Sequence, residues 1–112
     1  MSKRSERLNE LIKREISKIF LRDVEFPINV LVTVTRAEVS DDLRDANVWI
    51  SVLPESKLKA VNKILYHQIF HIQQKINKTL RMRPLPKLKF VEEEETKEAD
   101  KIEELLGKIK TE

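Results

Sequence analysis

The chain has 112 residues, of which 37% are charged and 40% hydrophobic, a composition typical of one folded domain rather than of a disordered segment. It contains no cysteine and a single glycine, which excludes disulfides, thiolate catalysis and glycine-rich phosphate-binding loops. No apolar run reaches the roughly 18 residues that a membrane-spanning helix needs, and the first residues fit neither a signal peptide nor a transit peptide. We therefore expect residues 1–112 to form one cytoplasmic domain that does not engage a membrane.

The net charge of +3 conceals a block pattern. Residues 1–22 carry seven basic and three acidic side chains, residues 23–56 carry two and seven, and residues 92–112 carry four and nine. Residues 57–91 hold nine basic side chains and no acidic one. A basic block of this strength favours a nucleic acid or an anionic membrane as the partner.

The first predicted helix spans residues 5–21. Apolar residues recur at helical spacing between Leu8 and Phe20, and Ser2 or Ser5 can cap its start. The basic residues of its other face either are simply solvated or contact phosphate. They are Arg7, Lys13, Arg14 and Lys18.

Residues 29–53 are predicted to form an antiparallel hairpin, with strands at 29–39 and 45–53 and a turn at 40–44. The alternating valines before Thr35 share one face, whereas Ala37 and Val39 fall on the other face unless a bulge near Thr35–Arg36 resets the register. We therefore expect that bulge. Trp49 has the outward parity of its strand, where it either stacks on a nucleic-acid base or covers a sheet edge or a neighbouring loop.

The basic block opens with a long predicted helix, for which Ser56 is the expected N-cap. An apolar stripe runs from Leu58 to Leu80 at steps of three or four, so one face packs on a core while most of the cations face water. The stripe slips at Gln68, Ile69 and Phe70. Such a slip indicates either a kink or a helix that is buried on two faces.

Pro84 and Pro86 end this helix, and residues 88–91 alternate as a short third strand. The acidic run 92–95 is predicted to be a solvated connector, after which Thr96 caps a last helix inside the acidic C-terminal segment 92–112. The order helix, strand, strand, kinked helix, strand, helix predicts an α+β fold, with a three-stranded sheet that has helices on one face.

The sequence offers no catalytic constellation. His67 and His71 have a metal-ligand spacing but lack the glutamate of a zinc protease and a third ligand. Asp41, Asp42 and Asp45 are best explained as turn formers. We therefore expect no enzymatic activity, no metal, no cofactor and no small-molecule substrate.

Three segments resemble the ribosome-binding factor A family. They are Arg4-x-x-Arg7–Leu8 with Leu11–Ile12 and Glu15–Ile16; the run from Val32 to Leu53; and Leu80–Arg81–Met82–Arg83 followed by Pro86, Leu88 and Phe90–Val91, with the trailing Ile102, Leu105 and Leu106. The resemblance covers nearly the whole chain, in order.

The resemblance implies a KH-like fold of the helix-first kind (type II). It also implies a non-catalytic, monomeric factor that binds 16S rRNA in the small (30S) ribosomal subunit during late maturation and rRNA processing. KH modules clamp the RNA backbone with a GXXG loop, which the family replaces by an Ala-x-Gly kink. This chain has Gln68–Ile69–Phe70 there, and it has Asp23–Val24–Glu25 where the family favours Asp-Pro-Arg.

Seven basic residues are predicted to contact RNA phosphates: Arg36, Lys75, Lys78, Arg81, Arg83, Lys87 and Lys89. About five such contacts would give a plot of log affinity against log salt a slope of roughly −4. Two alternatives are a generic KH-type nucleic-acid-binding module that is indifferent to pre-ribosomes, and a protein-interaction module that uses the acidic tail and the exposed sheet.

Overall fold

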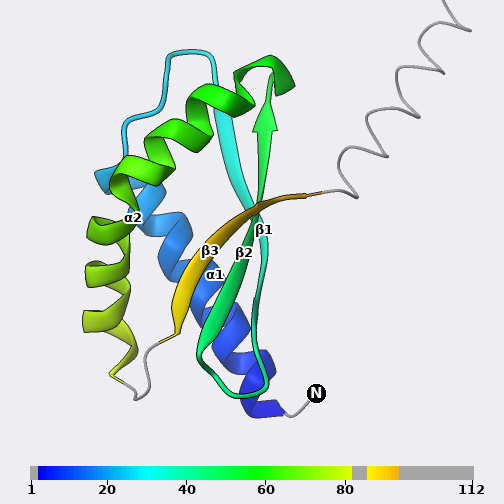
Figure 1. Cartoon of the computed structure of the whole chain (residues 1–112), viewed down its shortest axis with the longest axis vertical. Helices are drawn as coiled ribbons and strands as arrows, with labels where there is room; N and C mark the ends of the chain where they lie inside the picture. The colour runs from blue at the N-terminus through cyan, green and yellow to red at the C-terminus, as the bar shows by residue number, and fades with distance from the viewer. Residues whose placement is uncertain (1–2, 82–85, 94–112) are drawn as a thin grey trace, which may run out of the picture.

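The computed structural model describes residues 3–81 and 86–93. The elements run in the order α1 (Lys3–Asp23), β1 (Leu31–Val39), β2 (Asp45–Leu53), a short 3-10 helix η1 (Glu55–Lys57), α2 (Leu58–Leu80) and β3 (Lys87–Glu92), as Figure 1 shows. The predicted C-terminal helix and Arg83 lie outside the described residues.

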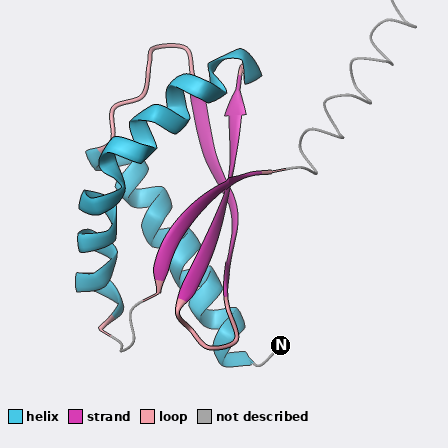
Figure 2. Cartoon of the chain, viewed as in Figure 1, coloured by secondary structure: helices cyan, strands magenta, loops and turns pink. Residues whose placement is uncertain are grey.

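The three strands form one sheet in the order β1-β2-β3 (Figure 2). The predicted hairpin is confirmed, since β1 and β2 pair antiparallel. β3 pairs with the other side of β2 and runs parallel to it. Parallel neighbours need a long crossover connection, and α2 provides it by carrying the chain from the end of β2 back to the start of β3.

The predicted bulge is present in β1. Val34 lies opposite Ile50 and Arg36 lies opposite Trp49, so Thr35 is the extra residue. The bulge lets Val34 and Ala37, which are three positions apart, both be buried. Arg36 consequently faces outward.

The hydrophobic core lies between the two helices and one face of the sheet. Its members on β2 alternate with outward-facing residues, as a half-buried strand requires. Full burial of one valine, leucine or isoleucine side chain stabilises the fold by about 1.5–3 kcal/mol. Among the described residues, no element packs on the opposite face of the sheet, called here the outer face. The core residues on β2, α1 and α2 include Ala46, Val48, Ile50, Val52, Ile12, Ile16, Val61, Leu65, Ile72 and Ile76.

Helix α2 starts differently from the prediction. Ser56 is not the N-cap: the 3-10 turn places it inside η1, where the Lys57 N–H donates to the Pro54 carbonyl at 3.0 Å, and Lys57 then occupies the N-cap without a side-chain cap. The helix ends at Leu80, the last residue of the predicted stripe, and its C-cap Arg81 takes the left-handed conformation (φ 47°, ψ 42°) that usually falls to glycine.

The predicted bend in α2 is present. Figure 1 shows that the first half of the helix runs across the top of the molecule and the second half runs down its side. The side chains of Tyr66 and Phe70, near the slipped stripe, are 78% and 72% exposed. The slip therefore marks a bend and not a second buried face.

The turn between β1 and β2 confirms the assignment of Asp42 as a turn former. Its Oδ1 accepts hydrogen bonds from the Ser40 hydroxyl at 2.6 Å and from the Arg44 N–H at 3.1 Å. The hydrogen bond from the Ser40 hydroxyl has the larger effect and the one from the Arg44 N–H the smaller, and both lower the pKa of the Asp42 carboxyl below its usual value. Leu43 closes the turn in the left-handed region, at φ 61°.

The prediction that residues 92–95 form a solvated connector is wrong at Glu92 and Glu93. β3 continues to Glu92, and the Glu93 N–H donates to the Ile50 carbonyl at 2.9 Å. This extra pairing holds Glu93 against the sheet, where it is only 5% exposed. Glu94 and Glu95 lie outside the described residues.

Candidate nucleic-acid interface

Helix α2 ends near the start of β3, at one end of the molecule (Figure 1). Exposed cations lie on both segments there. Lys78 lies in the last turn of α2, Arg81 caps it, and Lys87 opens β3; all three side chains are exposed. In the part of the chain that the structure describes, none of the three has an ion-pair partner. We call Lys78, Arg81 and Lys87 the basic end.

Gln73 fixes the two elements of the basic end to each other. Its Nε2 donates to the Pro86 carbonyl, and its Oε1 accepts from the Leu88 N–H, both at 2.9 Å. The amide thus pairs with the free edge of β3 much as a neighbouring strand would, which sets the position of Lys87 relative to Lys78. Sequence reasoning missed this residue, because a glutamine in a helix carries no signal of a partner so far along the chain.

Lys75 was predicted to contact phosphate, but its charge is already balanced. Its Nζ lies 2.7 Å from Oδ1 of Asp23, at the end of α1. The ion pair ties α2 to α1. A phosphate would have to compete with this carboxylate for Lys75, whereas it would not at Lys78.

Arg36 lies away from the basic end, on the outer face of the sheet. Its Nε is 3.3 Å from Oε2 of Glu93, and its Cζ lies 4.0 Å from the centre of the Trp49 ring. Thr35, the bulge residue, donates its hydroxyl to the same Oε2 at 2.7 Å. Arg36 therefore covers one face of the Trp49 ring, so a base could stack on that face only by displacing Arg36.

Lys89 also lies on the outer face. Its Nζ is 3.9 Å from Oδ1 of Asp45 on the neighbouring strand. Both side chains are about half exposed, so the pair is weak and screened by salt. The structure thus separates the seven predicted residues into the three of the basic end, three that have a carboxylate partner, and Arg83 outside the described residues.

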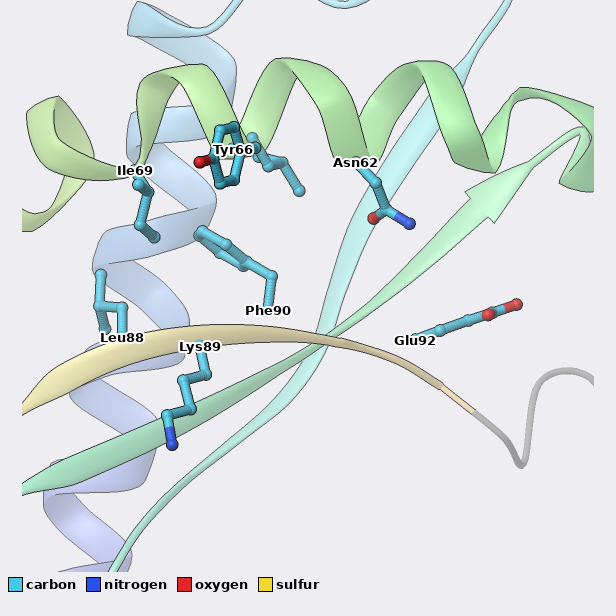
Figure 3. Close-up of a pocket in the computed structure, with 8 residues that line it drawn as sticks. Asn62, Tyr66, Ile69, Leu88, Lys89, Phe90 and Glu92 are labelled. Atoms are coloured by element: carbon cyan, nitrogen blue, oxygen red, sulfur yellow. The ribbon is translucent and has the colours of Figure 1, made fainter.

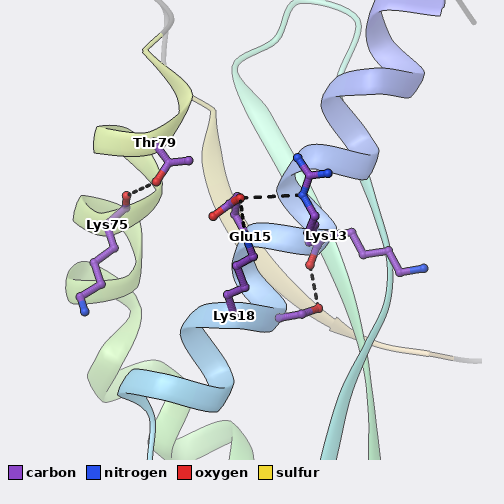
Figure 4. A network of polar contacts seen from close by, with 7 residues as sticks. Lys13, Glu15, Lys18, Lys75 and Thr79 are labelled. Atoms are coloured by element: carbon purple, nitrogen blue, oxygen red, sulfur yellow. Dashed lines mark hydrogen bonds and ion pairs between the residues drawn. The ribbon is translucent and has the colours of Figure 1, made fainter.

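An acidic residue, Glu15, lies among the basic residues of α1. Glu15 lies between Lys18, at 3.4 Å, and Arg14, at 3.9 Å (Figure 4). The Ser17 hydroxyl is turned back to the Lys13 carbonyl at 2.7 Å. Part of the positive charge of this helix is therefore balanced locally, which favours solvation over a phosphate-binding role.

An apolar groove runs between α2 and the free edge of β3. Figure 3 shows Tyr66, Ile69, Leu88 and Phe90 converging on a hollow of about 390 Å³, with Lys89 at its margin. A second hollow of about 350 Å³ continues along Ile69 and Leu88 to Lys87. The groove therefore reaches the basic end.

Neither a metal site nor a membrane segment is found in the described residues. No three His, Cys, Asp or Glu side chains are grouped so that they could hold an ion, and His67 and His71 are exposed on α2. No helix in ranges 3–81 and 86–93 is long and apolar enough to cross a bilayer.

A three-stranded mixed sheet, helices on one face only and the order α1-β1-β2-α2-β3 define a small α+β domain of the KH-like type, as the resemblance implied. The family model of ribosome-binding factor A matches residues 4–106. The chain belongs to the ribosome-binding factor A family.

Individual relatives agree with this assignment. A ribosome-binding factor A of Thermodesulfovibrio yellowstonii is 36% identical over 108 residues, which is 96% of this chain and 92% of the relative. The crystal structure of ribosome-binding factor A from Thermus thermophilus superimposes with a TM-score of 0.69 at 20% identity, over 79% of this chain and 94% of that one. A homology model of the Thermus thermophilus factor, fitted into a cryo-EM map of a 30S complex, gives a TM-score of 0.59 at 25% identity, over 74% and 88%.

Proposed function

We propose that this chain is an assembly factor that binds the small ribosomal subunit during late maturation and contacts 16S rRNA through the basic end. Family membership supports the ribosomal role, and the Thermus thermophilus factor has been fitted into a map of a 30S complex. The observation that carries the choice of surface is the position of Lys78, Arg81 and Lys87, exposed at one end without carboxylate partners among the described residues.

The charges of the basic end favour contact with the RNA backbone rather than recognition of a base sequence. Lysine and arginine side chains that meet phosphates fix the orientation of a protein on RNA without reading bases. The four other predicted residues remain part of the proposal. Three of them must first break an ion pair with a carboxylate before they can bind a phosphate: Arg36, Lys75 and Lys89. We expect these three to contribute less than the basic end does.

The groove beside the basic end adds a place for unpaired nucleotides. Its wall carries the exposed ring of Tyr66, and exposed aromatic rings stack on bases with little regard to sequence. Lys87 lies along the same groove, where it can hold the backbone of a strand that enters it. The bent form of α2 thus takes the place of the GXXG loop of other KH modules.

The proposed factor is not an enzyme, acts as a monomer in the cytoplasm and needs no cofactor. Its task is to bind an immature particle and to leave the mature one. Binding of this kind depends on counterion release, so it must weaken as salt rises.

Co-sedimentation with purified immature and mature small subunits, across a salt series, tests this function. We expect preferential binding to immature particles, with a slope of roughly −4 for log affinity against log salt. Equal binding to both particles would favour a generic RNA-binding module. Binding that persists at high salt or after nuclease treatment would favour a protein-interaction module.

A further inference from the structure

Glu93 is a buried carboxylate at the end of β3. Its side chain reaches across β2 to the bulge of β1, where Oε2 accepts from Thr35 at 2.7 Å and pairs with Arg36 Nε at 3.3 Å. Oε1 is also buried and has no hydrogen-bond partner among the described residues. Glu93 therefore depends on Arg36 for its charge balance.

This dependence holds Arg36 in place. If Arg36 swung out to meet a phosphate, Glu93 would remain buried beside the hydroxyl of Thr35 alone, and an uncompensated buried charge is strongly unfavourable. The Trp49 ring, 4.0 Å from Cζ, favours the same position through a cation–π contact. Arg36 is thus half exposed but fixed.

A phosphate that approaches the outer face meets little net charge. The guanidinium of Arg36 has a carboxylate oxygen 3.3 Å away, and Lys89 has Asp45 at 3.9 Å. A protein cation that neutralises an RNA phosphate releases the salt cation condensed on that phosphate. Arg36, which the buried carboxylate of Glu93 already neutralises, leaves that salt cation in place. The basic end has no such pairing in the described residues, so the two surfaces differ in charge although the sequence supplies cations to both.

We propose that Glu93 is a specificity-determining residue, which neutralises Arg36 and thereby keeps the RNA backbone off the outer face of the sheet. RNA phosphates are then confined to the basic end. The inference rests on the proposed RNA-binding function. In this proposal, Glu93 determines which surface of the protein binds the RNA.

The substitution Glu93→Gln tests the proposal, because it removes the charge and keeps the size of the side chain. We expect the variant to bind a small-subunit rRNA fragment more tightly than the unmodified chain. If one phosphate is added, the salt slope should steepen by about 0.9, so that the gain in affinity is about threefold larger at 50 mM than at 200 mM salt.

Two controls separate this effect from a general change in net charge. Glu55→Gln removes the same charge from η1, where Glu55 is exposed, and should leave the salt slope unchanged. The double variant Arg36→Gln with Glu93→Gln removes both partners and should return affinity and slope to those of the unmodified chain. Fluorescence of Trp49, the single tryptophan, reports that the sheet stays folded in each variant.

The proposal fails if Glu93→Gln binds RNA no more tightly than the unmodified chain, or if Glu55→Gln gains as much. Both results leave the RNA-binding function standing, since the unmodified chain still binds. If the unmodified chain itself does not bind rRNA, the proposed function fails and this inference fails with it.

Discussion

Reversing the three charges of the basic end should nearly abolish binding to small-subunit rRNA. The variant carries Lys78→Glu, Arg81→Glu and Lys87→Glu. Losing three phosphate contacts should lower the affinity at least about 100-fold near 0.1 M salt and flatten the salt slope by between about 2 and 3. Filter binding or fluorescence anisotropy with an rRNA fragment, repeated across a salt series, measures both quantities.

The matched control reverses three lysines at the other end of the same basic block. Lys57, Lys59 and Lys63 are exposed on η1 and the first half of α2, so Glu substitutions there change the net charge equally. We expect a small loss of affinity from this long-range change and an almost unaltered slope. Equal losses in the two triple variants would show that net charge, and not the basic end, determines binding.

Deleting single residues from β1 should have opposite outcomes at neighbouring positions. Deleting Thr35 removes the extra residue of the bulge and leaves a regular strand in which Val34 and Ala37 still face the core. The fold should persist, with a loss of about 1.5–3 kcal/mol because Glu93 loses a hydrogen bond to a charged group. Urea unfolding monitored by Trp49 fluorescence measures this free energy.

Deleting Ala37 instead should unfold the domain. Whether or not the bulge is kept, either Arg36 or Glu38 must then take an inward position, and burying an unpaired charge costs several kcal/mol. That cost is comparable with the whole stability of a small domain, about 5–15 kcal/mol. A cooperative transition for the Ala37 deletion, similar to that of the Thr35 deletion, would contradict the register deduced for β1.

The features that could be predicted from the sequence are those that arise within one element. The bulge follows from the parity of Ala37 and Val39 against the valines before them, and the bend of α2 follows from the slipped stripe around Ile69. Both are properties of a periodic pattern, and the structure confirms both.

The features that could not be predicted depend on contacts between distant residues. Arg36 and Glu93 are far apart in the chain, and only the parallel pairing of β3 with β2 brings them together. The same holds for Lys75 and Asp23, and for the contact of Gln73 with Leu88. Basic residues can thus be counted from a sequence, but which of them remain free for phosphate is decided by tertiary packing.

Site-specific photo-crosslinking tests most directly which surface meets the rRNA. A photoreactive residue is placed at Lys78 in the basic end or at Thr33, which is exposed on the outer face, and each variant is irradiated with immature small subunits. We predict cross-links to 16S rRNA from position 78 and none from position 33. Cross-links from position 33 without any from position 78 would contradict the assignment of the RNA-binding surface to the basic end.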